Sequence, residues 1–541
     1  MKKSIKILSV IMAAIMLFGI VSTVSFAASN VYTRYVTVYG NGTYKGTKSN
    51  PWSLVDFMNN IDSINEKISS GERTEIVINV SSASGNYGET FKIDGIKGTA
   101  ATPVSIICNY IESGEGSNAN LETATGNAIE LIDCEYVTIK NMNICALSGD
   151  GILVKDCKNV TIENIDSYVK NSSVTKTMEK PIVFEGKSEN ITITGCDFSH
   201  VSEPITIMDT DEIAVENLDI KNIKIEKTVK EALVVDGVDN IEISNFTVTG
   251  AYSVGQEEPE YTADAAVVIK NSDGVSFADA KITECYSTAI KLDNVTNTTV
   301  ENVYSFDNAS FMINHLGANA NVRIRYCVSA YDNYYPTIIS STDASGIYLY
   351  NNTFYAAAAI NMNKLTDSAI ANNIYDMEFL GKVMINENNR FATNCYHNTF
   401  KNNADTGAIA KNPQFIISVT EKPSLDEFII ATDSVLREAG TKVEENMGTK
   451  DIYGNLISEE TKFNIGAYQG EGFQAIDEVD QNKDTMNFYT EVVKKYVGDF
   501  TQKLLDAFFT PEQQESIKET FNSVVSKIVS VVTAIIGSFV K

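Results

Sequence analysis

The chain has 541 residues, with 43 Lys and Arg against 70 Asp and Glu, so its formal net charge is −27. Such an acidic surface repels nucleic acid and anionic membranes, which excludes functions that depend on binding phosphate groups by charge. The length is sufficient for more than one domain.

Residues 1–27 have the pattern of a secretory signal peptide. The stretch begins with three lysines, continues with an apolar run and ends on Ser25-Phe26-Ala27, which fits a cleavage site of small residues. An uncleaved membrane anchor is the alternative. Cleavage leaves 40 basic and 70 acidic residues, a net charge of −30. We therefore expect a secreted, extracellular protein that is free or associated with the cell surface and has no transmembrane segment.

Residues 28–125 are expected to form an N-terminal cap and the first coils of a repeat. Residues 34–39 alternate as a strand does, and glycine-rich turns follow. Pro51 then opens one amphipathic helix, whose apolar face runs from Trp52 to Ile68. Residues 75–80, 89–93 and 103–109 have strand character.

Residues 126–400 contain ten weak copies of one unit. The first strand residue of each copy serves as its anchor, and successive anchors are 21 to 34 residues apart. Repeats of this length indicate a solenoid, in which each unit packs on its neighbours. The anchors are Val137, Val160, Ile191, Ile213, Ile241, Val275, Thr298, Val322, Ile347 and Ser368.

Each unit is predicted to hold a strand at the anchor and another before it. Four residues after the anchor, nine of the ten copies have Asn, Gly or Asp, which tolerate the left-handed backbone of a tight bend. Asparagines stacked at such a bend can also hydrogen-bond from coil to coil. Eight residues before the anchor an inward column is expected: Ile129, Ile152, Val183, Ile205, Leu233, Val267, Ile290, Asn314, Ile339 and Ile360.

Two strands, an Asn-rich bend, a third short strand and a variable loop make up the coil of a parallel β-helix. The pattern resembles the right-handed β-helices of the pectate-lyase-like superfamily, which implies an all-β, right-handed parallel β-helix solenoid. The N-terminal strand, turn and helix are similar to the entry of bacterial members, which implies an N-terminal cap helix over the first coil. This resemblance is specific for the fold rather than for an activity.

Two further segments follow the repeat. Residues 401–474 resemble the exit of secreted β-helix proteins and are expected to close the last coil. Residues 475–541 predict a C-terminal α-helical hairpin of two amphipathic helices, with a final apolar run of 13 residues that is too short to span a bilayer. This helical tail either packs on the solenoid or on itself, or docks to a partner or surface.

Eight cysteines occur without metal-binding spacing. Cys134 and Cys157 fall in one column of adjacent coils, about 4.8 Å apart, within reach of a disulfide. A stack of buried free thiols is the preferred interpretation.

A candidate site follows from the resemblance, which places it on the outer face of the strand before the anchor, beside the variable loops. Lys291 is the candidate base, and His315, expected one coil on, shares that role. Asp236, Asp264 and Asp293 are candidate calcium ligands. Tyr331, Tyr334, Tyr335 and Ser340 are candidate substrate contacts.

The alternative for Asp236, Lys270 and Asp293 is a surface ladder of ion pairs, and Arg325 beside Glu301 is expected to be structural. We predict a secreted carbohydrate-active protein, with a lyase that cleaves uronate polysaccharide by β-elimination as one possibility. A non-catalytic glycan-binding or adhesion protein of the cell surface is the other. In both cases the expected partner is a polysaccharide, and the lyase would need calcium to neutralise the polyanion.

Overall fold

The computed structural model describes residues 30–37, 45–81, 88–110, 119–167, 178–210, 212–254, 260–262, 264–314, 319–340, 343–386, 388–457 and 462–473. The predicted signal peptide and helical tail lie outside these residues, and so does His315. Within the described part, no helix is both long and apolar enough to cross a membrane.

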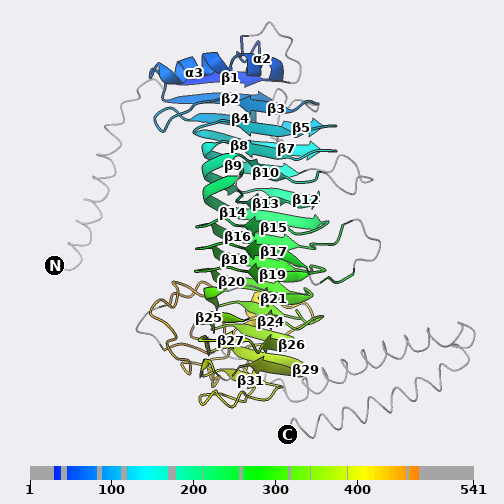
Figure 1. The fold of residues 1–541 in the computed structure, drawn as a ribbon, viewed down its shortest axis with the longest axis vertical. Coiled ribbons are helices and arrows are strands. Elements are labelled where there is room, and N and C mark those ends of the chain that lie inside the picture. Colours follow the sequence, from blue (N-terminus) through cyan, green and yellow to red (C-terminus); the bar gives the residue numbers. More distant parts are fainter. Residues whose placement is uncertain are drawn as a thin grey trace, which may run out of the picture.

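The described chain is a parallel β-solenoid of 31 strands, stacked along the long axis of the molecule (Figure 1). Every strand pair is parallel, and each strand bonds to the strand at the same place in the next coil. The coils therefore build three ladders, which we number in the order in which one coil passes through them. One apolar core runs inside the ladders from Tyr32 to Tyr396.

The first ladder contains β3 (Phe91–Asp94), β6 (Ile129–Ile132), β8 (Ile152–Lys155), β10 (Ile182–Glu185), β13 (Ile205–Met208), β15 (Leu233–Asp236), β17 (Ala265–Lys270), β19 (Thr288–Asp293), β21 (Ser310–Asn314) and β24 (Ile338–Ser340). It continues with the second halves of β26 (Thr353–Met362) and β29 (Ile374–Ile385).

The second ladder contains β1 (Val31–Val36), β2 (Glu75–Ser81), β4 (Val104–Tyr110), β11 (Lys187–Thr194), β22 (Ala320–Arg325), β25 (Ala344–Tyr350), β27 (Leu365–Thr366), β28 (Ala369–Ala371) and β30 (Arg390–Ala392). The third contains β5 (Ala119–Thr123), β12 (Asp197–Val201), β23 (Val328–Ala330) and β31 (Cys395–His397), and the first halves of β26 and β29. Six long strands pass from the second to the third: β7 (Val137–Ala146), β9 (Lys158–Ser167), β14 (Ala214–Thr228), β16 (Glu242–Thr249), β18 (Ser276–Thr283) and β20 (Thr299–Phe306).

The predicted bend between the second and third ladders is confirmed. Nine of the ten predicted residues lie there with positive φ, and side chains bond between coils, as from Asn164 to Asn141 at 2.8 Å and from Asn302 to Asp279 at 3.1 Å. The exception is Asn217. The register pairs Ile191 with Leu218, so Leu218 is the anchor of that coil instead of Ile213, and Asn222 occupies its bend.

A second positive-φ column, which the sequence analysis missed, lies one residue before the corrected anchors. Asn159, Asn190 and Asn217 occupy it in successive coils, and their side chains form a second ladder of amide hydrogen bonds. Each second-ladder strand therefore lies between two left-handed positions, which explains the abundance of Asn, Asp and Gly.

The inward column of the first ladder was predicted wrongly in three coils. The register places Ile182, Met312 and Ile338 in this column, in place of Val183, Asn314 and Ile339. In these coils the turn between the first and second ladders is one or two residues longer, so a fixed count of eight from the anchor selects the wrong residue.

The N-terminal region contains two helices where one was expected. Ser53 caps α2 (Leu54–Asn59) through reciprocal bonds with Asp56, and α3 (Ile61–Ser69) follows. The break falls at Asn60, which has non-helical dihedral angles and whose side chain donates to the carbonyl of Asp56 at 2.7 Å. Trp52 lies outside the helix, in a bridge to Val36. Both helices lie at the first coils, where Phe57 contacts Phe91.

The segment predicted to close the last coil is described over residues 401–457 and 462–473, and we call it the closing segment. It runs back along the outer faces of the second and third ladders, and its one helix is the 3-10 turn η1 (Leu425–Phe428). Pro423 accepts a bond from Tyr304, and Lys450 reaches Asp279 at 3.0 Å. Both outer faces are therefore covered along the C-terminal coils.

All eight cysteines are buried, and Cys134 and Cys157 are free thiols. Their column lies in the core, and each thiol donates a hydrogen bond to a carbonyl oxygen of a neighbouring strand, with no disulfide between the two. The preferred interpretation of the sequence is therefore confirmed for this pair.

Candidate functional site: the tyrosine platform at the loop edge

Four tyrosines meet at the edge where the third ladder passes into the first. Tyr261 stacks on Tyr334, with ring centroids 4.4 Å apart and planes 27° apart. Tyr286 lies 5.3 Å from Tyr261, and Tyr335 contacts Tyr334 edge to face at 5.0 Å. Tyr334 is 61% exposed, whereas the other three are half-buried. We call Tyr261, Tyr286, Tyr334 and Tyr335 the tyrosine platform.

Backbone bonds between coils hold the platform in place. Thr262 donates its N–H to the carbonyl of Tyr286 at 2.8 Å, and Tyr335 donates its N–H to Ala309 at 2.8 Å. The hydroxyl of Tyr335 also donates to the carbonyl of Tyr261 at 3.4 Å. The last bond joins the loop of Tyr335 to the loop of Tyr261, 74 residues earlier in the sequence. The two loops meet because the solenoid places them along the same edge.

A buried carboxylate holds the turn between β23 and β24, which carries Tyr334 and Tyr335 and which we call the tyrosine loop. Asp332 is fully buried and accepts bonds from the backbone N–H of Asn308 at 2.9 Å, from its side-chain amide at 3.0 Å and from the Ser329 hydroxyl at 2.7 Å. Burial raises the pKa of Asp332 to about 6, although these hydrogen bonds favour the charged form.

Tyr331, which was predicted to contact substrate with Tyr334 and Tyr335, points elsewhere. Its ring packs edge to face on Phe306 and Tyr355, and its hydroxyl donates to Thr420 of the closing segment at 3.3 Å. It therefore belongs to the contact between the third ladder and the closing segment.

The outer face of the first ladder carries the predicted charged column. Asp236, Lys270 and Asp293 are register neighbours, and Lys270 forms an ion pair with Asp236 at 3.0 Å. Asn271 donates to the other oxygen of Asp236 at 2.8 Å. Among the described residues, no group of three His, Cys, Asp or Glu side chains could hold a metal ion. Asp264 is exposed and accepts from Thr262, at the loop edge.

Lys291 lies in the next outward column, and it is half-buried. Its register neighbours are Val268 and Ile313, so the expectation that His315 follows it one coil on is wrong. Ser340 pairs with Asn314, in the column of the buried Leu292, and is therefore not in the column of Lys291. The register thus places Val268 and Ile313 on either side of Lys291, and the proposed role of Lys291 stays a prediction.

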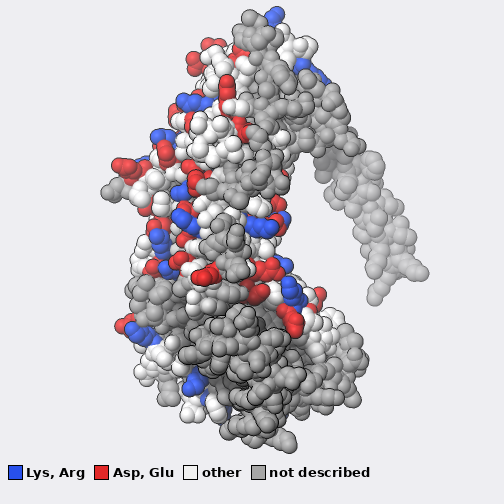
Figure 2. Space-filling model, turned by 90° about the vertical axis from the view of Figure 1, so that its right-hand side faces the viewer, with Lys and Arg blue, Asp and Glu red and all other residues white. Residues whose placement is uncertain are grey.

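Basic and acidic side chains are interspersed over the face shown in Figure 2, and they form no separate blocks of one sign. Ion pairs also link neighbouring coils of the described chain, as between Lys155 and Glu185 at 3.1 Å and between Lys230 and Glu203 at 2.6 Å. This arrangement is typical of a solvated solenoid surface.

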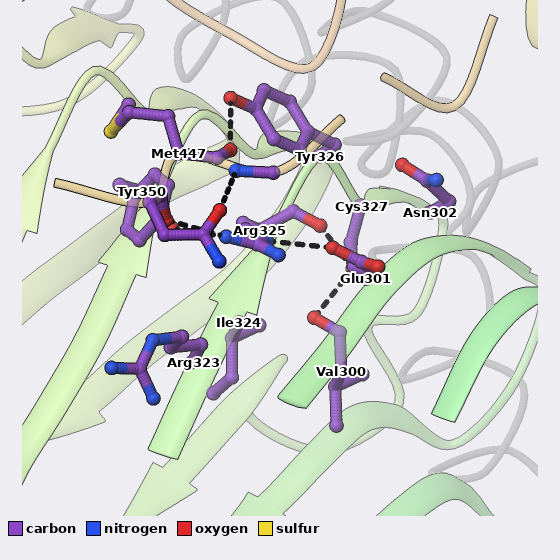
Figure 3. A network of polar contacts seen from close by, with 12 residues as sticks. Val300, Glu301, Asn302, Arg323, Ile324, Arg325, Tyr326, Cys327, Tyr350 and Met447 are labelled. Carbon is purple, nitrogen blue, oxygen red and sulfur yellow. Dashed lines mark hydrogen bonds and ion pairs between the residues drawn. The ribbon is translucent and has the colours of Figure 1, made fainter. Parts of the chain in front are cut away.

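A second polar cluster lies under the closing segment (Figure 3). Arg325 is 6% exposed and donates to Glu301 at 2.7 Å, to the Tyr350 hydroxyl at 2.9 Å and to the Asn446 carbonyl at 2.9 Å. Tyr350 donates to Glu444 at 2.6 Å, and Glu444 also accepts from Arg323. Because Tyr350 is fully buried, this network fixes the closing segment and offers no access to a substrate. The predicted Glu301–Arg325 ion pair is confirmed.

Three residues of the loop edge were missed by sequence reasoning. Tyr286, Asp307 and Asp332 lie in turns between the third and first ladders, where loop lengths vary most. A signal was present, because all three follow a third-ladder strand by a few residues, as Tyr334 and Tyr335 do.

The family model described as "Right handed beta helix region" matches residues 105–257 and 213–374. No curated protein matches the chain. Solved structures that it resembles include a GH136 lacto-N-biosidase from Eubacterium ramulus, at 14% identity, covering 66% of this chain and 67% of that one, with a TM-score of 0.40. Another is XylC in complex with xylose, at 11% identity, 82% and 99% coverage and a TM-score of 0.44.

A third solved structure that the chain resembles is a mannuronic acid specific polysaccharide family 6 lyase from human gut microbiota. The identity is 10%, the match covers 69% of this chain and 86% of that one, and the TM-score is 0.40. The repeat, the parallel register and the family match together identify the chain as a right-handed parallel β-helix protein.

Proposed function

We propose that this protein is secreted and binds polysaccharide through the tyrosine platform. The observation that carries the proposal is the stacked pair of Tyr261 and Tyr334, with Tyr334 61% exposed. The face of a sugar ring presents aliphatic C–H groups, and an exposed aromatic ring offers them dispersion contact and burial. A ring fixed by its neighbours loses little conformational entropy when it binds.

The position of the platform supports the same conclusion. The closing segment covers the outer faces of the second and third ladders along the C-terminal coils, where it packs on Tyr304 and Tyr350. The loop edge beside the first ladder carries the exposed ring of Tyr334 in the same coils. A chain-like ligand that follows the solenoid axis would meet the platform there.

The binding test uses soluble polysaccharides embedded in a native gel, which retard the protein in proportion to affinity. We expect Tyr334→Ala to weaken retardation by about tenfold, the effect of losing one aromatic contact of about 1.4 kcal/mol. Phe400→Ala is the matched control, because Phe400 is an exposed ring, 81% accessible, outside the platform. Equal retardation of wild type and Tyr334→Ala on every polymer would refute the proposal.

Cleavage by β-elimination remains a prediction, with Lys291 as base and calcium as cofactor. It is tested by the absorbance of unsaturated uronate ends on pectate and alginate, with and without calcium. Product formation that Lys291→Ala abolishes would establish the lyase. Retardation without product would establish the binding protein.

We also propose a role for the segment at each end of the solenoid. We infer that α2 and α3 cap the first coil, since Leu54, Phe57 and Ile64 are buried against it.

We further propose that residues 475–541 form the predicted helical hairpin and dock to a partner or surface. Gel filtration of the chain with and without residues 475–541 tests docking, and an unchanged monomer would argue against it.

A further inference from the structure

Carboxylates surround the tyrosine platform. Asp264 is exposed three residues after Tyr261, and its carboxylate accepts from the Thr262 hydroxyl at 3.2 Å. Asp307 is exposed two coils further on, between the coils of Tyr286 and Tyr335, and has the left-handed backbone of a tight turn. Asp332 lies below the tyrosine loop and is fully buried.

Two of these carboxylates act on the platform electrostatically. The pKa of Tyr261 is raised to about 12, first by burial and then by nearby negative charge, which Asp307 and Asp332 supply at neutral pH. With a pKa of about 6, Asp332 is mainly ionised at neutral pH, and its charge persists beneath the loop.

A negative field at a binding surface decides between ligands of different charge. A carboxylate that approaches the platform meets like charges, and each such contact costs affinity. A sugar hydroxyl or ammonium group can instead donate hydrogen bonds to the exposed carboxylates of Asp264 and Asp307. Specificity of this kind comes from repulsion of the wrong ligand as much as from attraction of the right one.

We propose that the tyrosine platform, flanked by Asp264 and Asp307, selects glycans of neutral or amino sugars and rejects polyuronates. This inference rests on the proposed function and narrows its ligand class. It also departs from the uronate substrate that the sequence suggested.

The test compares two pairs of polymers, in each of which a small substituent removes the charge. Polygalacturonate is paired with its fully methyl-esterified form, and glycol chitosan with its N-acetylated form, all in low salt with EDTA. We expect the esterified polymer to bind about tenfold more tightly than polygalacturonate, and glycol chitosan to bind more tightly than its acetylated form. Added salt should reduce both differences in affinity, because it screens the charges.

The variant Asp264→Asn/Asp307→Asn keeps the size of both side chains and removes their charge. It should gain affinity for polygalacturonate and lose the preference for glycol chitosan, while Tyr334→Ala loses affinity for all four polymers. Binding of polygalacturonate as tight as that of its ester would overturn the inference and leave polysaccharide binding intact. Absence of binding to all four polymers would instead overturn the proposed function.

Discussion

Asp332 and Asp264 both carry a carboxyl group at the same edge of the solenoid, yet the environments of the two groups differ. Asp264 is exposed, whereas Asp332 is fully buried and its neighbours supply only hydrogen-bond donors without charge. A buried carboxylate without a cation beside it favours its neutral form, which explains the raised pKa. The residue thus fixes the tyrosine loop at some cost in stability near neutral pH.

Replacement of Asp332 by Asn should change how stability depends on pH. The native pKa of about 6 exceeds the ordinary value of 3.8, so the folded state binds more protons between these values. Stability of the wild type should therefore fall as pH rises from about 4 to about 6, by up to about 3 kcal/mol, relative to Asp332→Asn. Urea midpoints of both proteins at pH 4, 5 and 7 measure this, and parallel curves would contradict it.

The pair of His397 and Asp376 makes stability fall with rising pH as well, but at a higher pH than Asp332 does. Burial alone would lower the pKa of His397, but the charge of Asp376 and the 3.0 Å contact with it outweigh burial and raise that pKa. Because the native pKa lies above its ordinary value of 6.5, the stabilisation is complete below that value and is lost as pH rises through the native pKa.

In Asp376→Asn the pKa of His397 should fall below its ordinary value, since burial then acts alone. The chain has three histidines, so imidazole resonances can be titrated by NMR, with His397→Gln as the assignment control. A His397 pKa that does not move in Asp376→Asn would show that Asp376 does not hold the proton on the ring.

At the scale of elements, the closing segment is attached by a few buried polar contacts. The hydroxyl of Tyr326 donates to the Met447 carbonyl at 2.8 Å, next to the Arg325 network that binds Glu444 and Asn446. These partners come from β20, β22 and β25 on the solenoid and from a stretch without regular secondary structure. The stretch therefore depends on tertiary contacts for its conformation.

Replacement of Arg325 by Leu should release this stretch. It leaves Glu301 without its buried partner, and loss of one member of a buried ion pair costs about 3–5 kcal/mol. We expect faster proteolysis between residues 440 and 456, measured by mass spectrometry of timed digests. Lys442→Ala is the control, because its partner Glu445 is 98% exposed and such pairs contribute little. Equal digestion rates for both variants would disprove the attachment.

At the scale of the whole molecule, the core is a column of side chains that the coils stack in register. Cys285 and Cys327 belong to this column, and burial raises the pKa of each thiol to about 12. Almost no thiolate is then present at pH 8, and the thiols are also shielded from reagents.

The native protein should therefore react slowly with a thiol reagent at pH 8, and Cys134 and Cys157 should react fully once the protein is unfolded in denaturant without reductant. Peptide mapping after alkylation measures both. A peptide in which Cys134 is linked to Cys157 before reduction would contradict the arrangement of free thiols in the core.

The sequence by itself determined the repeat, the parallel solenoid and most of its bends. These follow from local rules: alternation marks a strand, and Asn, Asp or Gly marks a left-handed bend, wherever the coil lies. The ion pair of Glu301 with Arg325 was also predictable, because the two residues lie in coils whose anchors were counted correctly.

Only the tertiary structure decided which residues meet on the surface. The turn before β22 is two residues longer than expected, which moved Ile313 into the place expected for His315 beside Lys291. Loop length likewise gave no indication that Tyr261 would stack on Tyr334, or that Tyr331 would turn under the closing segment. Strand and bend preferences act within a few residues, whereas these contacts depend on register and packing between coils.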